Sequence, residues 1–148
     1  MARLKQAWVG APLWAIDAGR GRAVFQKSCA PCHVHGSMGS ALGPNLTGSW
    51  GNGPDYFIDN LVDPNAVVGP DYQLTVIVTD EGSSINGILA EETPTTLVLK
   101  TPEGLVTVAK EQLEERRTSP VSMMPTGLLE QMPEADMLAI IKFLTTKP

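Results

Sequence analysis

Two cysteines and a histidine form the stretch of this chain best suited to chemistry. The segment reads Cys29-Ala30-Pro31-Cys32-His33 and contains both cysteines of the sequence. Two thiols at this spacing can add across the two vinyl groups of one porphyrin, and the imidazole that follows can ligate its iron. The spacing therefore predicts one covalently bound haem c, held by Cys29 and Cys32, with His33 as the proximal ligand.

Two other kinds of site use similar residues. A thioredoxin-like Cys-x-x-Cys needs a surrounding βαβ pattern, which this sequence does not show. A structural zinc site needs four ligands, for which the nominal set is Cys29, Cys32, His33 and His35. These are packed too tightly in sequence to close a tetrahedron easily. Haem attachment is the better interpretation, and His35, the one spare histidine, is expected at the surface on the proximal side.

A low-spin haem iron needs a sixth ligand, and methionine is the usual partner of histidine in electron-transfer cytochromes. Residues 119–125 read Ser-Pro-Val-Ser-Met-Met-Pro and are expected to form a loop bracketed by prolines. Pro125 pushes the residue before it to an extended conformation, which favours Met124 as the metal ligand. Met123 is the alternative. In a third interpretation both methionines only line the haem crevice and the iron is five-coordinate.

Other side chains are expected to support the site. The Pro44 carbonyl can accept a hydrogen bond from the His33 ring, which would fix the orientation and basicity of the imidazole. Trp50 carries an N–H that needs a partner if buried, either a haem propionate or a backbone carbonyl. Tyr56 and Tyr72 are further candidates for contacting a propionate.

Three helices are expected to position these residues. The first covers residues 18–27 behind a capping Asp17, and the last begins at Pro133. A short helix over residues 54–62 lies between them, and its inward-facing residues are expected to be Tyr56, Phe57, Ile58 and Leu61. Gly21 in the first helix would allow a close approach of the last one. The sequence therefore predicts a crossed-helix contact.

The residues of this contact can be named. Gly21 and Phe25 are four apart and share one helix face. Phe143 in the last helix is expected to pack against both.

These motifs, in this order, resemble a class I cytochrome c domain, and in particular the planctomycete-type haem-binding domain. The resemblance covers about residues 17–144 and is carried by Gly21-x-x-x-Phe25, Cys29-x-x-Cys32-His33, Gly43-Pro44-Asn45-Leu46, Asp63-Pro64-Asn65-Ala66 and Ser122-Met123-Met124-Pro125. It implies Cys29 and Cys32 as thioether anchors and His33 and Met124 as axial ligands. It also implies a β-rich insertion before the methionines, and occurrence at the C-terminus of larger proteins.

The residues between about 72 and 110 follow a different pattern. They are rich in β-branched residues and broken by turn signals, with expected strands at residues 72–79, 84–90, 95–100 and 105–109. Such a meander is either a docking or shielding module or a structural elaboration that covers the haem edge.

The predicted fold class is α+β, a mostly α cytochrome c fold with an inserted small antiparallel β meander. Residues 17–148 form the cytochrome c domain, with 72–110 as the β-rich insertion, and residues 1–16 form an N-terminal arm or linker.

Charge is distributed unevenly along the chain. The formal net charge is −5, yet residues 1–33 carry five basic side chains and one acidic one, and residues 71–115 carry nine acidic and two basic ones. An acidic chain of this kind is not a nucleic-acid binder. Its uneven charge can orient it on a redox protein partner during a transient encounter.

The sequence contains no apolar run long enough for a transmembrane segment, and residues 1–13 are too short and interrupted for a complete signal peptide. Thioether maturation takes place outside the cytoplasm in bacteria. We therefore expect an exported, periplasmic protein whose signal or larger upstream polypeptide has been removed.

The predicted function is one-electron transfer between redox partners by a non-enzymatic monohaem c-type cytochrome. A haem-based sensor that binds CO or NO is one alternative. Another is the electron-transfer domain of a larger dehydrogenase or membrane complex. A peroxidase is disfavoured, because the expected distal loop offers only serine and methionine.

Overall fold

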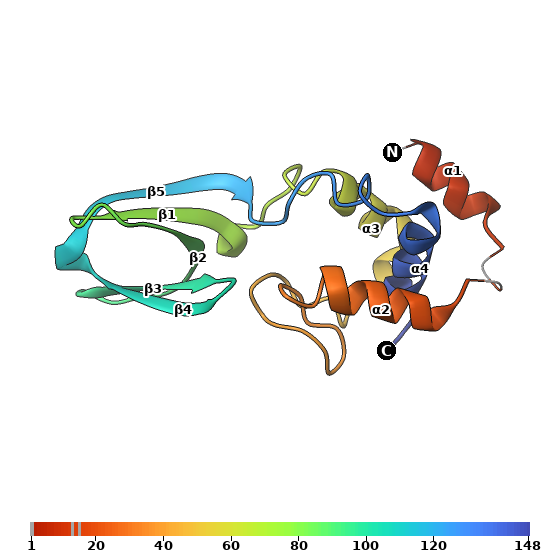
Figure 1. The fold of residues 1–148 in the computed structure, drawn as a ribbon, viewed down its shortest axis with the longest axis horizontal. Helices are drawn as coiled ribbons and strands as arrows, with labels where there is room; N and C mark the ends of the chain where they lie inside the picture. The colour runs from red at the N-terminus through yellow and green to blue at the C-terminus, as the bar shows by residue number, and fades with distance from the viewer. Residues whose placement is uncertain (1, 13, 15) are drawn as a thin grey trace. The chain divides into compact units, whose positions relative to one another are not determined.

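The computed structural model describes residues 2–12, 14 and 16–148; Met1, Leu13 and Ala15, all in the predicted N-terminal arm, lie outside the described residues. The chain forms two compact units (Figure 1). The helical unit comprises Met1–Ala66 and Pro125–Pro148, and the β unit comprises Val67–Met124. Helices and an antiparallel sheet together confirm the predicted α+β class.

The three predicted helices of the helical unit begin within one residue of their expected positions, and a further helix lies within residues 1–16, which were predicted as an arm or linker. The helices are α1 (Ala2–Gly10), α2 (Ala18–Ser28), α3 (Gly53–Val62) and α4 (Glu134–Thr145), with a 3-10 turn η2 (Ser49–Asn52) before α3. The Asp17 carboxylate caps α2 by accepting a 2.8 Å hydrogen bond from the Gly19 N–H. Pro133 immediately precedes α4, and Glu134 and Asp136 occupy its first turn, where acidic side chains complement the helix dipole.

The contact between α2 and α4 closes the helical unit. Gly21 lies so close to α4 that a Cβ atom there would overlap the Ala139 carbonyl oxygen and come within 2.7 Å of the Phe143 Cβ. Phe25 is fully buried, and its ring centroid lies 5.6 Å from that of Phe143. The crossed-helix contact predicted from the sequence is confirmed.

Helix α3 buries only part of the predicted face. Phe57, Ile58 and Leu61 are buried, as expected, whereas Tyr56 is 42% exposed. The inward-facing prediction for Tyr56 is therefore wrong. A ten-residue helix that covers a core on one side buries a single stripe, and Tyr56 stands at the edge of the stripe that Phe57 and Leu61 define.

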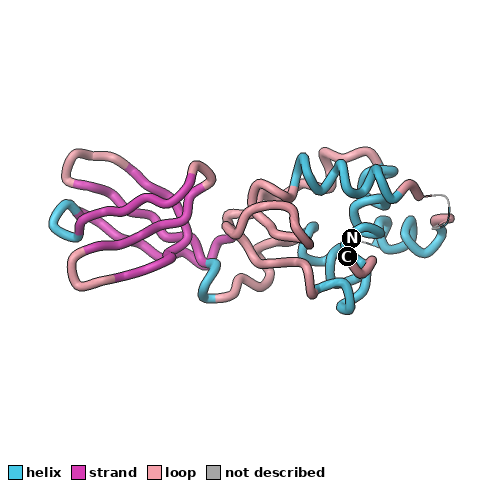
Figure 2. Tube along the Cα trace, turned by 90° about the horizontal axis from the view of Figure 1, so that it is seen from below, coloured by secondary structure: helices cyan, strands magenta, loops and turns pink. Residues whose placement is uncertain are grey.

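The β unit is one antiparallel sheet, whose strands are drawn in magenta in Figure 2. The strand order is β4-β3-β2-β1-β5. The strands are β1 (Gln73–Thr79), β2 (Ser84–Glu92), β3 (Thr96–Thr101), β4 (Gly104–Ala109) and β5 (Leu113–Ser122), with short 3-10 turns at η3 (Pro70–Tyr72) and η4 (Lys110–Gln112). The first four strands form the predicted meander, and β5 then returns to pair with β1.

The fifth strand differs from the sequence-based expectation. The predicted insertion ends at residue 110, and residues 119–125 were expected to be a loop, but β5 continues the sheet to Ser122. Its sequence, LEERRTSPVS, has no apolar alternation because most of its residues are exposed at the edge of the sheet. An edge strand also tolerates Pro120, which read as a loop signal in the sequence.

The sheet curls around a core of its own. Ile77 from β1, Leu97 and Leu99 from β3 and Val108 from β4 form one buried cluster. Figure 1 shows the resulting layers, with β1 and β5 on one side and β3 and β4 on the other. Gly87 in β2 permits the close crossing with β3, because a Cβ there would lie 2.6 Å from the Lys100 carbonyl oxygen.

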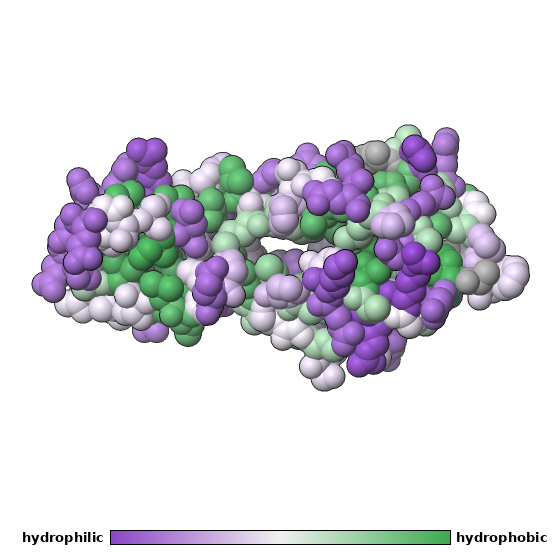
Figure 3. Space-filling model, in the orientation of Figure 1, coloured by the Kyte–Doolittle hydropathy of each residue, from purple (hydrophilic) through white to green (hydrophobic). Residues whose placement is uncertain are grey.

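The net negative charge belongs to the β unit. The helical unit has seven acidic and seven basic side chains, whereas the β unit has nine acidic and four basic ones. Hydrophilic residues gather at the end of the β unit that holds the β1–β2 turn and η4 (Figure 3). Near this end, Glu92 pairs with Lys110 at 2.7 Å and Arg116 at 3.0 Å, linking β2 to η4 and β5.

We predict that Gly21→Ala destabilises the protein by about 1–3 kcal/mol, because the added methyl group overpacks the contact between α2 and α4. Urea denaturation of the two proteins measures the difference. Gly19→Ala is the matched control, since Gly19 is exposed and meets only the flexible Asp17 carboxylate. A comparable loss in the Gly19 variant would contradict the packing explanation.

The Lys110 and Arg116 side chains hold the pKa of Glu92 below its usual value. Their contribution to stability is present above the ordinary glutamate pKa and is lost as pH falls through the lowered pKa of the folded protein. We therefore expect Glu92→Gln to be mildly destabilising at neutral pH, and the difference to disappear in acid and shrink in high salt.

Thermal unfolding of wild type and variant across this pH range is the measurement. Glu91→Gln is the control, because Glu91 is the neighbouring exposed carboxylate and forms none of the ion pairs found among the described residues. An equal effect of both substitutions, or a difference that persists in acid, would refute the ion-pair explanation.

Candidate functional site

A tight turn after α2 presents the two thiols and the imidazole. The Cys29 N–H donates to the Phe25 carbonyl at 2.8 Å, which continues the helix by one residue. The N–H groups of Cys32 and His33 both donate to the Cys29 carbonyl, at 3.0 and 2.8 Å. Backbone hydrogen bonds within residues 29–33 therefore hold the three side chains on one turn that is anchored to α2.

The His33 ring is oriented by the backbone of the loop that follows. Its Nδ1 lies 2.8 Å from the Pro44 carbonyl oxygen, which is the contact expected from the sequence. A carbonyl oxygen can only accept, so Nδ1 carries the hydrogen and donates it. In the neutral ring, the other nitrogen, Nε2, then carries the lone pair. This is the tautomer that a histidine needs to ligate a metal through Nε2.

Two glycines allow the loop to lie against His33. A Cβ on Gly43 would come within 2.8 Å of the His33 Cε1 and 3.1 Å of its Nδ1. Gly39 has a φ of +94°, and a Cβ there would overlap the His33 carbonyl. The Gly43 N–H also donates to the Cys32 carbonyl at 2.6 Å. Sequence reasoning did not assign a role to either glycine, although their short spacing after the Cys-His motif was a visible signal.

The thiol environment does not suit a reactive dithiol. Cys29 is buried, and burial, helped by the neighbouring Cys32, raises the pKa of its thiol to about 11. Burial also raises the pKa of Cys32. Thioredoxin-like cysteines depend instead on a lowered pKa that yields a thiolate near neutral pH. Both cysteines are free thiols here and stay protonated at neutral pH.

His35 is not at the surface, and the sequence-based prediction for it is wrong. It is 2% exposed, and its ring centroid lies 5.6 Å from that of Phe25 and 4.8 Å from that of Phe143. The chain folds back after His33, where the His35 N–H bonds to the Met38 carbonyl, and α2 and α4 then enclose the ring. Proximity to His33 in sequence gave no sign of this enclosure.

The position of His35 also bears on the zinc alternative. Its ring lies in the aromatic contact of α2 with α4, and its Nδ1 has no hydrogen-bond partner among the described residues. Within the described part of the chain, no three His, Cys, Asp or Glu side chains are grouped closely enough to hold a metal ion. The nominal four-ligand set is therefore not assembled.

The remaining predicted residues lie in different parts of the fold. Trp50, in η2, is 40% exposed, so its indole N–H does not require a protein partner. Tyr72 ends η3 in the β unit and is half-buried. Met124 is the last residue of the β unit, and its N–H donates to the Ser122 hydroxyl at 3.1 Å. Among the described residues, every helix is too short or too polar to cross a lipid bilayer.

Comparison with known protein families identifies the segment that carries Cys29, Cys32 and His33. Residues 17–73 match the family model described as cytochrome C oxidase, cbb3-type, subunit III. The matched region contains α2, the turn with Cys29, Cys32 and His33, the Gly43–Pro44 contact and α3. No curated protein sequence matches the chain.

Residues 17–73 are therefore a cytochrome c domain. Such a domain implies covalently bound haem c and haem-based electron transfer with redox partners, and both cysteines for the attachment are present at Cys29 and Cys32.

Gly43→Ala tests whether this loop orients His33. We expect the added methyl group to displace the imidazole from the Pro44 carbonyl, which lowers the yield of low-spin holoprotein and shifts its reduction potential. Absorption spectra and potentiometric titration of the purified holoprotein measure both effects. Gly48→Ala is the matched control, because no atom lies near that position. An unperturbed Gly43 variant would show that the loop does not position the ring.

Proposed function

We propose that this chain is a monohaem c-type cytochrome that transfers one electron at a time between protein partners. Cys29 and Cys32 would form the thioether bonds, and His33 would be the proximal iron ligand. The observation that carries this proposal is the 2.8 Å contact of the His33 Nδ1 with the Pro44 carbonyl, which directs the lone pair of the ring to Nε2.

The surrounding residues fit a covalently bound haem. Cys29 and Cys32 are unpaired thiols on a turn held by backbone hydrogen bonds, so both are available for thioether formation. Gly39 and Gly43 allow the loop backbone to pack against His33, which would support the ring as an iron ligand. When bound, haem supplies an iron that changes between the ferric and ferrous states. The fixed His33 ring lowers the reorganisation that accompanies this change, because its hydrogen bond to the backbone need not alter.

We propose Met124 as the sixth ligand, with Met123 as the alternative. Pro125 disfavours a helical backbone at Met124, and the Ser122 hydroxyl accepts a hydrogen bond from the Met124 N–H. Both features limit the freedom of this residue. The resemblance to the planctomycete-type domain, which extends beyond the matched segment to about residue 144, also favours Met124. Propionate contacts by Trp50 and Tyr56 remain part of the proposal, and the exposure of both side chains leaves their polar atoms accessible.

The proposed partners are redox proteins that bind transiently. Weak electron-transfer complexes use small interfaces, and opposite charges steer their encounter. The net negative charge of this protein lies in the β unit, so a partner with a basic surface is favoured. We propose an exported location, since attachment of haem c takes place outside the bacterial cytoplasm.

A second candidate is an electron-transfer domain within a larger assembly. The matched family is described by the name of an oxidase subunit, which favours a fixed position in an enzyme complex over free diffusion. The chemistry at the haem would be the same in both cases. A haem-based sensor differs, because it needs an iron that exogenous ligands can reach.

Addition of CO to the dithionite-reduced holoprotein separates a carrier from a sensor. We expect the wild-type spectrum to stay unchanged, because a methionine sulfur would occupy the sixth position. Met124→Leu should bind CO, whereas Met123→Leu, its matched control, should not. CO binding by Met123→Leu but not by Met124→Leu would instead assign Met123 as the sixth ligand. Rapid and complete CO binding by the wild type would overturn the carrier proposal in favour of a sensor.

A further inference from the structure

One edge of the β unit is unpaired. The strand order places β4 at one end of the sheet and β5 at the other, and β4 pairs only with β3. The register between β3 and β4 shows which backbone groups of β4 are used. The Lys110 N–H donates to the Thr95 carbonyl at 2.8 Å, so this pair is a hydrogen-bonded one.

Hydrogen-bonded pairs alternate along an antiparallel ladder. Val108 and Val106 therefore bond to β3, and Leu105, Thr107 and Ala109 direct their N–H and C=O groups outward. Among the described residues, nothing hydrogen-bonds to these outward groups.

The two edges of the sheet are protected very differently. Strand β5 carries the usual safeguards against edge pairing, with charged residues, a proline and register shifts at both ends of its ladder with β1. Strand β4 reads GLVTVA and has neither a charge nor a proline. Leu105 is 70% exposed on it. An uncharged, open strand with an exposed leucine is a template for adding another strand.

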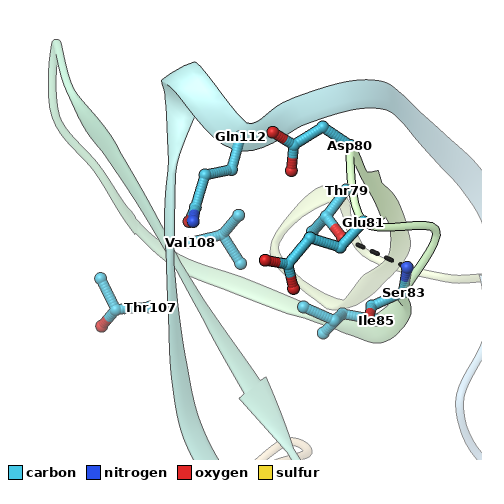
Figure 4. Close-up of a pocket in the computed structure, with 8 residues that line it drawn as sticks. All are labelled: Thr79, Asp80, Glu81, Ser83, Ile85, Thr107, Val108 and Gln112. Atoms are coloured by element: carbon cyan, nitrogen blue, oxygen red, sulfur yellow. Dashed lines mark hydrogen bonds between the residues drawn. The ribbon is translucent and has the colours of Figure 1, made fainter.

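The side chains of β4 leave room for such an addition. Val108 lines a shallow pocket of about 190 Å³ between the β1–β2 turn and η4, with Asp80 and Glu81 on its other wall. Figure 4 shows the Thr107 side chain pointing away from the other pocket residues. The outer face of β4 is thus formed by Leu105, Thr107 and Ala109, clear of the two carboxylates.

The sequence of β4 suits pairing with itself. Residues 105–109 read Leu-Val-Thr-Val-Ala, which is nearly symmetric about Thr107. Antiparallel pairing about that residue would place Thr107 opposite its own copy, Val106 opposite Val108, and Leu105 opposite Ala109. The outward N–H and C=O groups of both strands would meet in register, and the cross-strand Thr–Thr and Val–Val pairs are favourable in sheets.

We propose that β4 is a dimerisation strand, which pairs antiparallel with β4 of a second copy of this chain. The two five-stranded sheets then join into one continuous sheet across a two-fold axis. Each chain has a net charge of −5, so the copies repel one another at long range. Salt should therefore strengthen this dimer, whereas salt would weaken docking of a basic partner.

Sedimentation velocity of the holoprotein, from micromolar to millimolar concentration, tests the proposal. We expect a reversible dimer that tightens with added salt. Thr107→Lys should raise its dissociation constant at least about tenfold, because the two introduced charges would face each other across the axis. Leu105→Lys is a second variant for the same strand. Thr118→Lys is the matched control, an exposed threonine on the already protected edge strand β5, and should leave the dimer intact.

Far-ultraviolet circular dichroism and the haem spectrum verify that each variant is folded. A wild-type protein that stays monomeric throughout the concentration range would overturn the proposal. The open edge of β4 would then be a site for a strand from another protein. A dimer that survives both Thr107→Lys and Leu105→Lys, or that is lost equally in Thr118→Lys, would also overturn it, because the contact would then use another surface.

Discussion

The close contact of α2 with α4 is the constraint on which the helical unit depends. These helices come from opposite ends of the chain, and the β unit is inserted between them. Their approach requires a glycine at position 21, and the same contact buries Phe25 and His35 against Phe143. Because α2 leads directly into the turn that carries Cys29, Cys32 and His33, a contact between the chain ends fixes the base from which the cytochrome c site is built.

Within the site, most of the order is local. Backbone hydrogen bonds within residues 29–33 define the turn, and a loop only a few residues further on supplies the Pro44 carbonyl. Glycines rather than side chains make that loop fit, since Gly39 and Gly43 allow the backbone to lie against His33. Cys29 is buried, and the raised pKa values of both thiols suit a structural attachment point better than a reactive dithiol. The residues for haem attachment thus lie in the helical unit, whereas the proposed sixth ligand, Met124, is the last residue of the β unit.

The β unit contributes other properties. It has its own buried cluster, from β1, β3 and β4, and it carries the net charge of the chain. Its two edges differ, because β5 is charged and irregular whereas β4 is uncharged and open. The sheet thus has a buried core of its own, and the helical unit holds the residues for haem attachment.

The sequence by itself determined the local features. The Cys-x-x-Cys-His spacing, the Asp17 cap, the Pro133 boundary and the four-stranded meander follow from short-range rules of geometry and periodicity, and the structure contains each of them. The contact at Gly21 was also predicted, from a small residue that shares a helix face with Phe25, although it joins distant segments. Only the tertiary structure decided the rest. Strand β5 lacks apolar alternation because one edge of the sheet meets solvent, so no pattern marked it. His35 is buried because α2 and α4 pack around its ring, and α4 comes from a distant part of the sequence. Tyr56 is exposed because it stands at the edge of the buried stripe of α3. Burial depends on what packs from elsewhere in the chain, and residue spacing does not encode that.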